Sequence, residues 1–74
     1  MEAAATKTIQ IVVNGQVRKV PPAKSLLETL DFLEIDPSRV AVELNRNIVS
    51  RAAWNDVRLD DGAALEIVQF VGGG

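Results

Sequence analysis

Residues 9–20, IQIVVNGQVRKV, decide how the chain begins to fold. Positions 9, 11 and 13 are apolar, which is the two-residue period of a half-buried β-strand. Asn14-Gly15 follows, and this dipeptide favours a type I′ turn, in which both central residues have positive φ. Residues 16–20 return as a second strand, which Pro21-Pro22 ends because proline cannot donate to a ladder. The segment predicts a β-hairpin.

A helix signal follows the hairpin at residues 25–28, SLLE. This is a capping box, in which the Ser25 hydroxyl accepts from the third helical amide and the Glu28 carboxylate accepts from the Ser25 amide. Pro37 disfavours a helical conformation in the residue before it, so we expect the helix to end near Glu34, after about ten residues. The apolar positions i, i+4 and i+7 form one stripe: Leu26, Leu30 and Leu33.

The second half of the chain supplies three further strand signals. Residues 40–44, VAVEL, alternate and predict a third strand, and residues 48–49 predict a short edge strand. Residues 65–71 predict the last strand. Between the edge strand and the last strand, Ser50 is expected to cap a single helical turn over residues 51–54.

The order of these elements is strand, strand, helix, strand, short strand, strand, which predicts an α+β fold. A single leucine stripe is buried most economically by one helix across one face of a mixed sheet, with the first and last strands parallel at its centre. We therefore expect a ubiquitin-like β-grasp, with roughly four to five strands and one main helix. Residues 1–71 would form the domain and residues 72–74 a flexible glycine tail. The expected core is Ile9, Ile11, Val13, Leu26, Leu30, Leu33, Val40, Val42, Leu44, Leu65 and Ile67.

Composition limits what the protein can do. The chain has 74 residues, of which 47% are hydrophobic and 24% charged, an ordinary globular balance for one small domain. At about 0.05–0.15 kcal/mol per residue, the expected stability is about 4–11 kcal/mol. A net charge of -2 argues against a general affinity for nucleic acid or for an anionic membrane.

The chain contains no cysteine and no histidine, so the usual catalytic and metal-binding side chains are missing. We expect no catalytic residues, no metal site and no cofactor, and therefore not an enzyme. Residues 1–8 have no continuous apolar run and indicate neither a signal peptide nor a membrane span, which favours a cytoplasmic protein.

The C-terminal Gly72-Gly73-Gly74 is the most informative feature. Glycine has no Cβ, so a triglycine tail can carry a carboxylate into a narrow site of another protein. The Gly74 carboxylate is ionised at neutral pH and a poor electrophile, and activation by ATP would make it reactive. The sequence has no phosphate-binding loop, so the activating enzyme must be a separate protein. The alternative is a frayed tail without function.

Five segments carry a family resemblance: 11–15 (IVVNG), 25–27 (SLL), 40–45 (VAVELN), 49–54 (VSRAAW) and 66–74 (EIVQFVGGG). Over nearly its whole length the sequence resembles the thiamine-biosynthesis sulfur carrier proteins, the ThiS family. The tail alone is shared with molybdopterin-synthase small subunits, whereas segments 40–45 and 49–54 together are more specific to the thiamine branch. One departure is Ala63-Ala64, where such proteins often have an Asp.

The resemblance implies a cofactor-free sulfur carrier. An ATP-dependent adenylyltransferase would activate Gly74, and sulfur originating from a cysteine desulfurase would convert its carboxylate to a thiocarboxylate. The thiocarboxylate would donate sulfur to thiazole synthase for the thiazole ring of thiamine. Two alternatives remain: a carrier like the molybdopterin-synthase small subunit, or a ubiquitin-like interaction or modifier module.

The last strand also predicts a partner-binding surface. If Leu65 and Ile67 face the helix, Val68 and Phe70 lie on the open face of the sheet, next to the tail. We expect Phe70, Val68 and Val71 to bind the partner; the alternative places Phe70 under the loop 50–58.

Two further expectations concern the charged and aromatic side chains of the loops. Trp54 is expected to cover the core as a lid. Arg46, Arg51 and Arg58 are interpreted as solvent-facing loop charges, and the acidic side chains of the helix as a solvated face.

Overall fold

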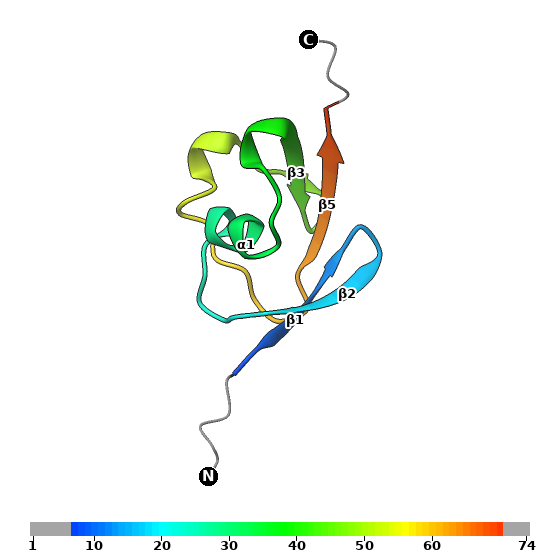
Figure 1. Cartoon of the computed structure of the whole chain (residues 1–74), viewed down its shortest axis with the longest axis vertical. Helices are drawn as coiled ribbons and strands as arrows, with labels where there is room; N and C mark the ends of the chain where they lie inside the picture. The colour runs from blue at the N-terminus through cyan, green and yellow to red at the C-terminus, as the bar shows by residue number, and fades with distance from the viewer. Residues whose placement is uncertain (1–6, 71–74) are drawn as a thin grey trace.

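A computed structural model describes residues 7–70 and shows one mixed five-stranded sheet crossed by one α-helix (Figure 1). The strand order is β2-β1-β5-β3-β4, so the last strand is central. It runs parallel to β1, and the other neighbouring pairs are antiparallel. The predicted β-grasp is confirmed. The strands are β1 (Ile9–Val13), β2 (Gln16–Val20), β3 (Val40–Leu44), β4 (Asn47–Ile48) and β5 (Ala64–Gln69); α1 is Leu26–Phe32, and η1 (Pro37–Arg39) and η2 (Arg51–Ala53) are 3₁₀ turns.

The hairpin forms as its turn dipeptide predicts. Asn14 and Gly15 have φ values of 50° and 85°, the positive values that a type I′ turn requires. The turn sets the register of β1 against β2, with Val13 opposite Gln16 and Val12 opposite Val17. Odd-numbered residues of β1 consequently face the helix, and Val12 and Val17 share the open face.

The helix begins at the predicted capping box and ends before the predicted Glu34. The Glu28 amide donates to Ser25 Oγ at 3.0 Å, and the Ser25 amide donates to Glu28 Oε1 at 2.9 Å. At the other end, Glu34 has a φ of 62°, which is left-handed and cannot continue a helix. The Ile35 amide then donates to the Leu30 carbonyl at 2.9 Å, which closes the last turn. The predicted helix was therefore too long.

Glu28→Gln is expected to reduce the acid sensitivity of the fold. The hydrogen bond from the Ser25 amide is the main reason that the pKa of Glu28 lies below its ordinary value of 4.5. A carboxyl whose pKa is lowered by folding stabilises the fold above the unfolded pKa, and this contribution is lost as pH falls through the folded pKa. Urea unfolding at neutral pH and at several pH values below 4.5 would measure the change.

The matched control for this prediction is Asp31→Asn, which removes a charge from the same helix and leaves the capping box intact. We expect the stability of this variant to fall with pH as it does in the unmodified chain. Equal acid sensitivity in the Glu28→Gln variant and the unmodified chain would contradict the assignment.

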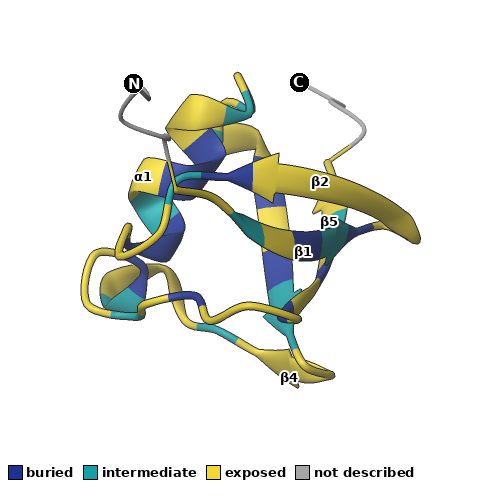
Figure 2. Ribbon diagram, turned by 90° about the horizontal axis from the view of Figure 1, so that it is seen from below, coloured by how far each residue is buried: buried dark blue, intermediate teal, exposed yellow. Residues whose placement is uncertain are grey.

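The core lies between α1 and the sheet face that it covers. Every predicted core residue is either buried there or packed partly buried against it. Trp54 is 2% exposed and donates from Nε1 to the Val49 carbonyl at 2.9 Å, so the predicted lid over the core is confirmed. Figure 2 shows exposed residues along much of β2 and β4, the two edge strands. Three buried hydrophobic residues were not predicted: Val20, Leu59 and Ala63.

Several element bounds differ from the predictions. The short edge strand is Asn47–Ile48, one position earlier than predicted, and β5 covers Ala64–Gln69. Val71, predicted to end the last strand, lies outside the described residues. The predicted single turn is present as η2, with Ser50 at its N-cap position, but the Ser50 side chain makes no capping hydrogen bond, so only that part of the prediction is wrong.

Candidate functional site

The predicted site residues lie partly outside the structure. Gly72, Gly73, Gly74 and Val71 are not among the described residues, whereas Val68 and Phe70 are. The described part of the candidate site is therefore the end of β5, from which the tail continues. The geometry of this strand end determines where the tail begins.

The end of β5 is held firmly on the side of β3. The antiparallel register runs without interruption from Val40 opposite Gln69 to Leu44 opposite Leu65. One residue beyond the strand, the Phe70 amide donates to the Arg39 carbonyl at 2.8 Å. The tail thus follows a central strand that is bonded to the β3 side as far as residue 70, which gives the tail a fixed starting point.

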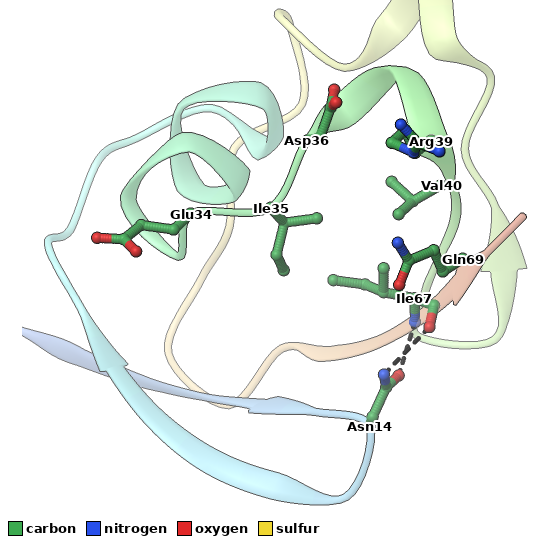
Figure 3. Close-up of a pocket in the computed structure, with 8 residues that line it drawn as sticks. All are labelled: Asn14, Glu34, Ile35, Asp36, Arg39, Val40, Ile67 and Gln69. Carbon is green, nitrogen blue, oxygen red and sulfur yellow. Dashed lines mark hydrogen bonds between the residues drawn. The ribbon is translucent and has the colours of Figure 1, made fainter.

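Asn14 holds β5 from the opposite side. Its main-chain amide donates to the Leu65 carbonyl at 2.9 Å. Its side chain then binds both main-chain groups of Ile67: Nδ2 donates to the carbonyl at 3.1 Å, and Oδ1 accepts from the amide at 2.7 Å (Figure 3). The sequence identified Asn14 only as a turn residue, because nothing local indicates a partner 53 positions away.

Val68 and Phe70 lie on the open face of the sheet. Val68 is 61% exposed and Phe70 52% exposed, so Phe70 is not covered by the loop 50–58, and that alternative is wrong. The register places two more exposed apolar residues on this face, Val17 opposite Val12 and Ile48 opposite Glu43. We call these four residues, Val17, Ile48, Val68 and Phe70, the open-face patch.

Arg51 is more than the solvent-facing charge predicted from the sequence. Its guanidinium donates from Nη1 to the Pro37 carbonyl and, at 3.1 Å from Nη2, to the Val40 carbonyl. It also lies over the Trp54 ring, 4.6 Å from the centroid. Arg51 therefore joins η2 to η1 and to the start of β3, the strand that holds the end of β5.

A hollow of about 380 Å³ lies beside the end of β5 (Figure 3). Apolar side chains and charged side chains both contribute to its lining. At its rim, Ser38 donates from its hydroxyl at 2.7 Å and from its amide at 3.0 Å to Asp36, and these bonds lower the pKa of the Asp36 carboxyl. The lining residues are Asn14, Glu34, Ile35, Asp36, Arg39, Val40, Ile67 and Gln69.

Residues 7–70 contain no group of three or more His, Cys, Asp or Glu side chains placed to hold a metal ion. In the same part of the chain, every helix is too short or too polar to span a membrane.

Comparison with known proteins gives the family. The model of the ThiS family matches residues 11–74, which is most of the chain and includes the three terminal glycines. The chain belongs to the ThiS family. It is similar to the crystal structure of the thiamine biosynthesis protein ThiS from Geobacter metallireducens, with a TM-score of 0.77 and 33% identity over 89% of this chain and 100% of that one. The family resemblance predicted from the sequence is confirmed.

Two curated relatives are much longer than this chain. They are thiazole synthases from Paramagnetospirillum magneticum and Magnetococcus marinus, 38% and 35% identical over 66 residues. The match covers 89% of this chain but only 20% of each synthase, so those proteins contain a ThiS-like segment within a longer chain.

Proposed function

We propose that Gly74 carries sulfur as a C-terminal thiocarboxylate for formation of the thiazole ring of thiamine. The observation that carries the proposal is the family match, which extends through Gly72 and Gly73 to the last residue. The tail thus belongs to the part of the chain that defines the family. A thin, side-chain-free tail on a firmly held strand suits delivery of a terminal group into the sites of other proteins.

The chemistry requires three other enzymes: one that activates Gly74, one that supplies the sulfur and one that accepts it. An ATP-dependent adenylyltransferase positions the Gly74 carboxylate to attack the α-phosphate, which releases pyrophosphate and leaves an acyl-adenylate. A cysteine desulfurase supplies sulfur as a persulfide, whose outer sulfur displaces AMP and forms an acyl disulfide with Gly74. A thiol then cleaves that disulfide, which releases the thiocarboxylate and leaves the thiol oxidised in a disulfide. A thiazole synthase accepts that sulfur. We place these steps in the cytoplasm, where ATP is available, and assign no catalytic residue to this chain.

Intact-mass measurement tests the proposal most directly. The chain is incubated with its adenylyltransferase, ATP, a cysteine desulfurase and cysteine. We expect a mass gain equal to the difference between one sulfur and one oxygen atom, located at Gly74 by fragmentation. An adduct with the mass of a second protein would instead indicate a conjugated modifier, and an unchanged mass would contradict the proposal.

We also propose that Phe70, Val68 and Val71 contact the adenylyltransferase. Phe70→Ala is expected to weaken that binding by more than about 1 kcal/mol, because an aromatic anchor loses its buried contact area. Phe32→Ala is a matched control, since Phe32 is 53% exposed but lies on α1, on the covered side of the sheet. Isothermal titration against the purified enzyme measures both variants.

Two outcomes would contradict the contact. One is equal affinity of the Phe70→Ala and Phe32→Ala variants for the enzyme. The other is a large loss of stability with normal affinity in the Phe70→Ala variant, which would show that Phe70 supports the fold and not the contact with the enzyme.

A further inference from the structure

The pairing of β1 with β5 stops before β5 ends. The parallel register contains only two pairs, Val12 with Ala64 and Val13 with Leu65. Beyond them the chain turns at Asn14, whose side chain binds the main chain of Ile67 in place of a continuing strand. Figure 1 shows β5 continuing past the hairpin with β3 beside it.

Alternation along β5 then identifies the next free main-chain groups. Main-chain groups of Ala64 and Phe70 bond on the β3 side, to Asn45 and Arg39. Leu65 and Ile67 bond on the β1 side, through Asn14. Because successive residues of a strand point their N–H and C=O groups to opposite sides, those of Gln69 face the β1 side. Because β1 ends before this point, no strand within residues 7–70 lies beside Gln69 on that side.

This free edge adjoins the hollow described above. Gln69 and Ile67 line the hollow from β5, and Asn14 lines it from the end of the hairpin (Figure 3). Ile35 and Val40 add apolar lining from the other side, and Glu34, Asp36 and Arg39 add charged groups. A strand placed beside Gln69 would direct alternate side chains toward this hollow. The edge therefore fits an extended peptide, and the apolar part of the hollow, formed by Ile35, Val40 and Ile67, fits one apolar side chain of that peptide.

We propose that the Gln69 edge of β5 binds an extended segment of a thiazole synthase by β-strand addition. The segment would exchange main-chain hydrogen bonds with Gln69 and place one apolar side chain in the hollow. The inference rests on the proposed function, in which the tail enters that enzyme. An enzyme that receives Gly74 lies within reach of the five residues that follow Gln69, and the relatives that contain a ThiS-like segment are themselves thiazole synthases.

A proline substitution tests the edge selectively. Gln69→Pro removes the N–H that faces the free edge and leaves the hydrogen bonds to β3 in place. The matched control is Gln69→Ala, which loses the same side chain and keeps the N–H. In titrations against purified thiazole synthase, we expect Gln69→Pro to bind about five- to tenfold more weakly than Gln69→Ala. Equal affinities would overturn the proposal.

Amide hydrogen exchange provides a second readout that needs no substitution. In the free chain, the Gln69 amide should exchange rapidly and the Phe70 amide, bonded to Arg39, slowly. With thiazole synthase bound, Gln69 should become protected at least tenfold. A Gln69 amide that stays unprotected in the complex, or a chain that does not bind the synthase, overturns the proposal.

Other results would identify a different molecule as the occupant of the Gln69 edge. Protection of Gln69 that grows with the concentration of the free chain, together with a dimer in sedimentation, would assign the edge to a second copy. Protection by the adenylyltransferase alone would assign it to that enzyme. Each result would overturn the thiazole synthase as the occupant. The proposed function fails separately, when Gly74 gains no sulfur in the intact-mass experiment.

Discussion

Adding one alanine after Gly74 is expected to abolish formation of the thiocarboxylate. The extra residue moves the terminal carboxylate by about 3.3–3.6 Å in an extended chain. It also places a Cβ at the terminus, where the proposed site admits a chain without side chains. Transfer to phosphorus requires the attacking oxygen to be correctly positioned, so a displacement of this size removes most of the rate. Intact-mass analysis over time would measure the loss.

A glycine-extended chain separates the two causes. It shifts the carboxylate by the same length but adds no side chain, so loss in both extended chains would assign the effect to position. Both variants should unfold at the same urea concentration as the unmodified chain, since residues 7–70 contain the whole described core. Thiolation of the alanine-extended terminus at the normal rate would show that position does not matter.

The parts of the fold that depend on local chemistry were predictable. Asn14-Gly15 determines the turn through its two positive φ values, and the capping box at residues 25–28 determines the start of α1. The end of the helix was not predictable in this way. Glu34 adopts a left-handed φ although it is neither glycine nor asparagine, so no local preference announces it. There the Ile35 amide closes the turn on Leu30, and the chain changes direction into η1.

For the candidate site, the sequence carries a signal only within a single segment. Three consecutive glycines suggest a functional tail without any knowledge of the fold. The two side chains that fix its base were missed, because each acts across the chain: Asn14 on Ile67, and Arg51 on Pro37 and Val40. Such contacts depend on which elements the fold brings together, and a turn residue or a loop arginine carries no sign of them in sequence.

The two halves of the candidate site have opposite requirements. The base must be fixed, and β5 meets this by its central place between β1 and β3 and by the Phe70 bond to Arg39. Under the proposed function the tail enters several enzymes in turn, which favours the absence of side chains. A stable core is therefore important for the proposed function chiefly because it holds β5, and with it the start of the tail, in place.

Leu30→Ala is expected to lower the free energy of unfolding by roughly 2–5 kcal/mol, which is a large share of the total. Leu30 is 0% exposed at the centre of the stripe that α1 packs against the sheet. Its truncation removes apolar contacts and leaves a cavity that a small core cannot easily close. Urea unfolding followed by Trp54 fluorescence measures the change, since Trp54 is buried in the same core.

Two further variants keep this test decisive. Phe32→Ala removes a larger side chain from the same helix, but one that is mostly in solvent, and should cost far less than Leu30→Ala. Leu30→Val leaves most of the side chain in place and should give an intermediate loss if Leu30→Ala prevents folding altogether. If both substitutions at Leu30 cost no more than Phe32→Ala, the leucine stripe does not hold α1 on the sheet, and the position of β5 must depend on the strands alone.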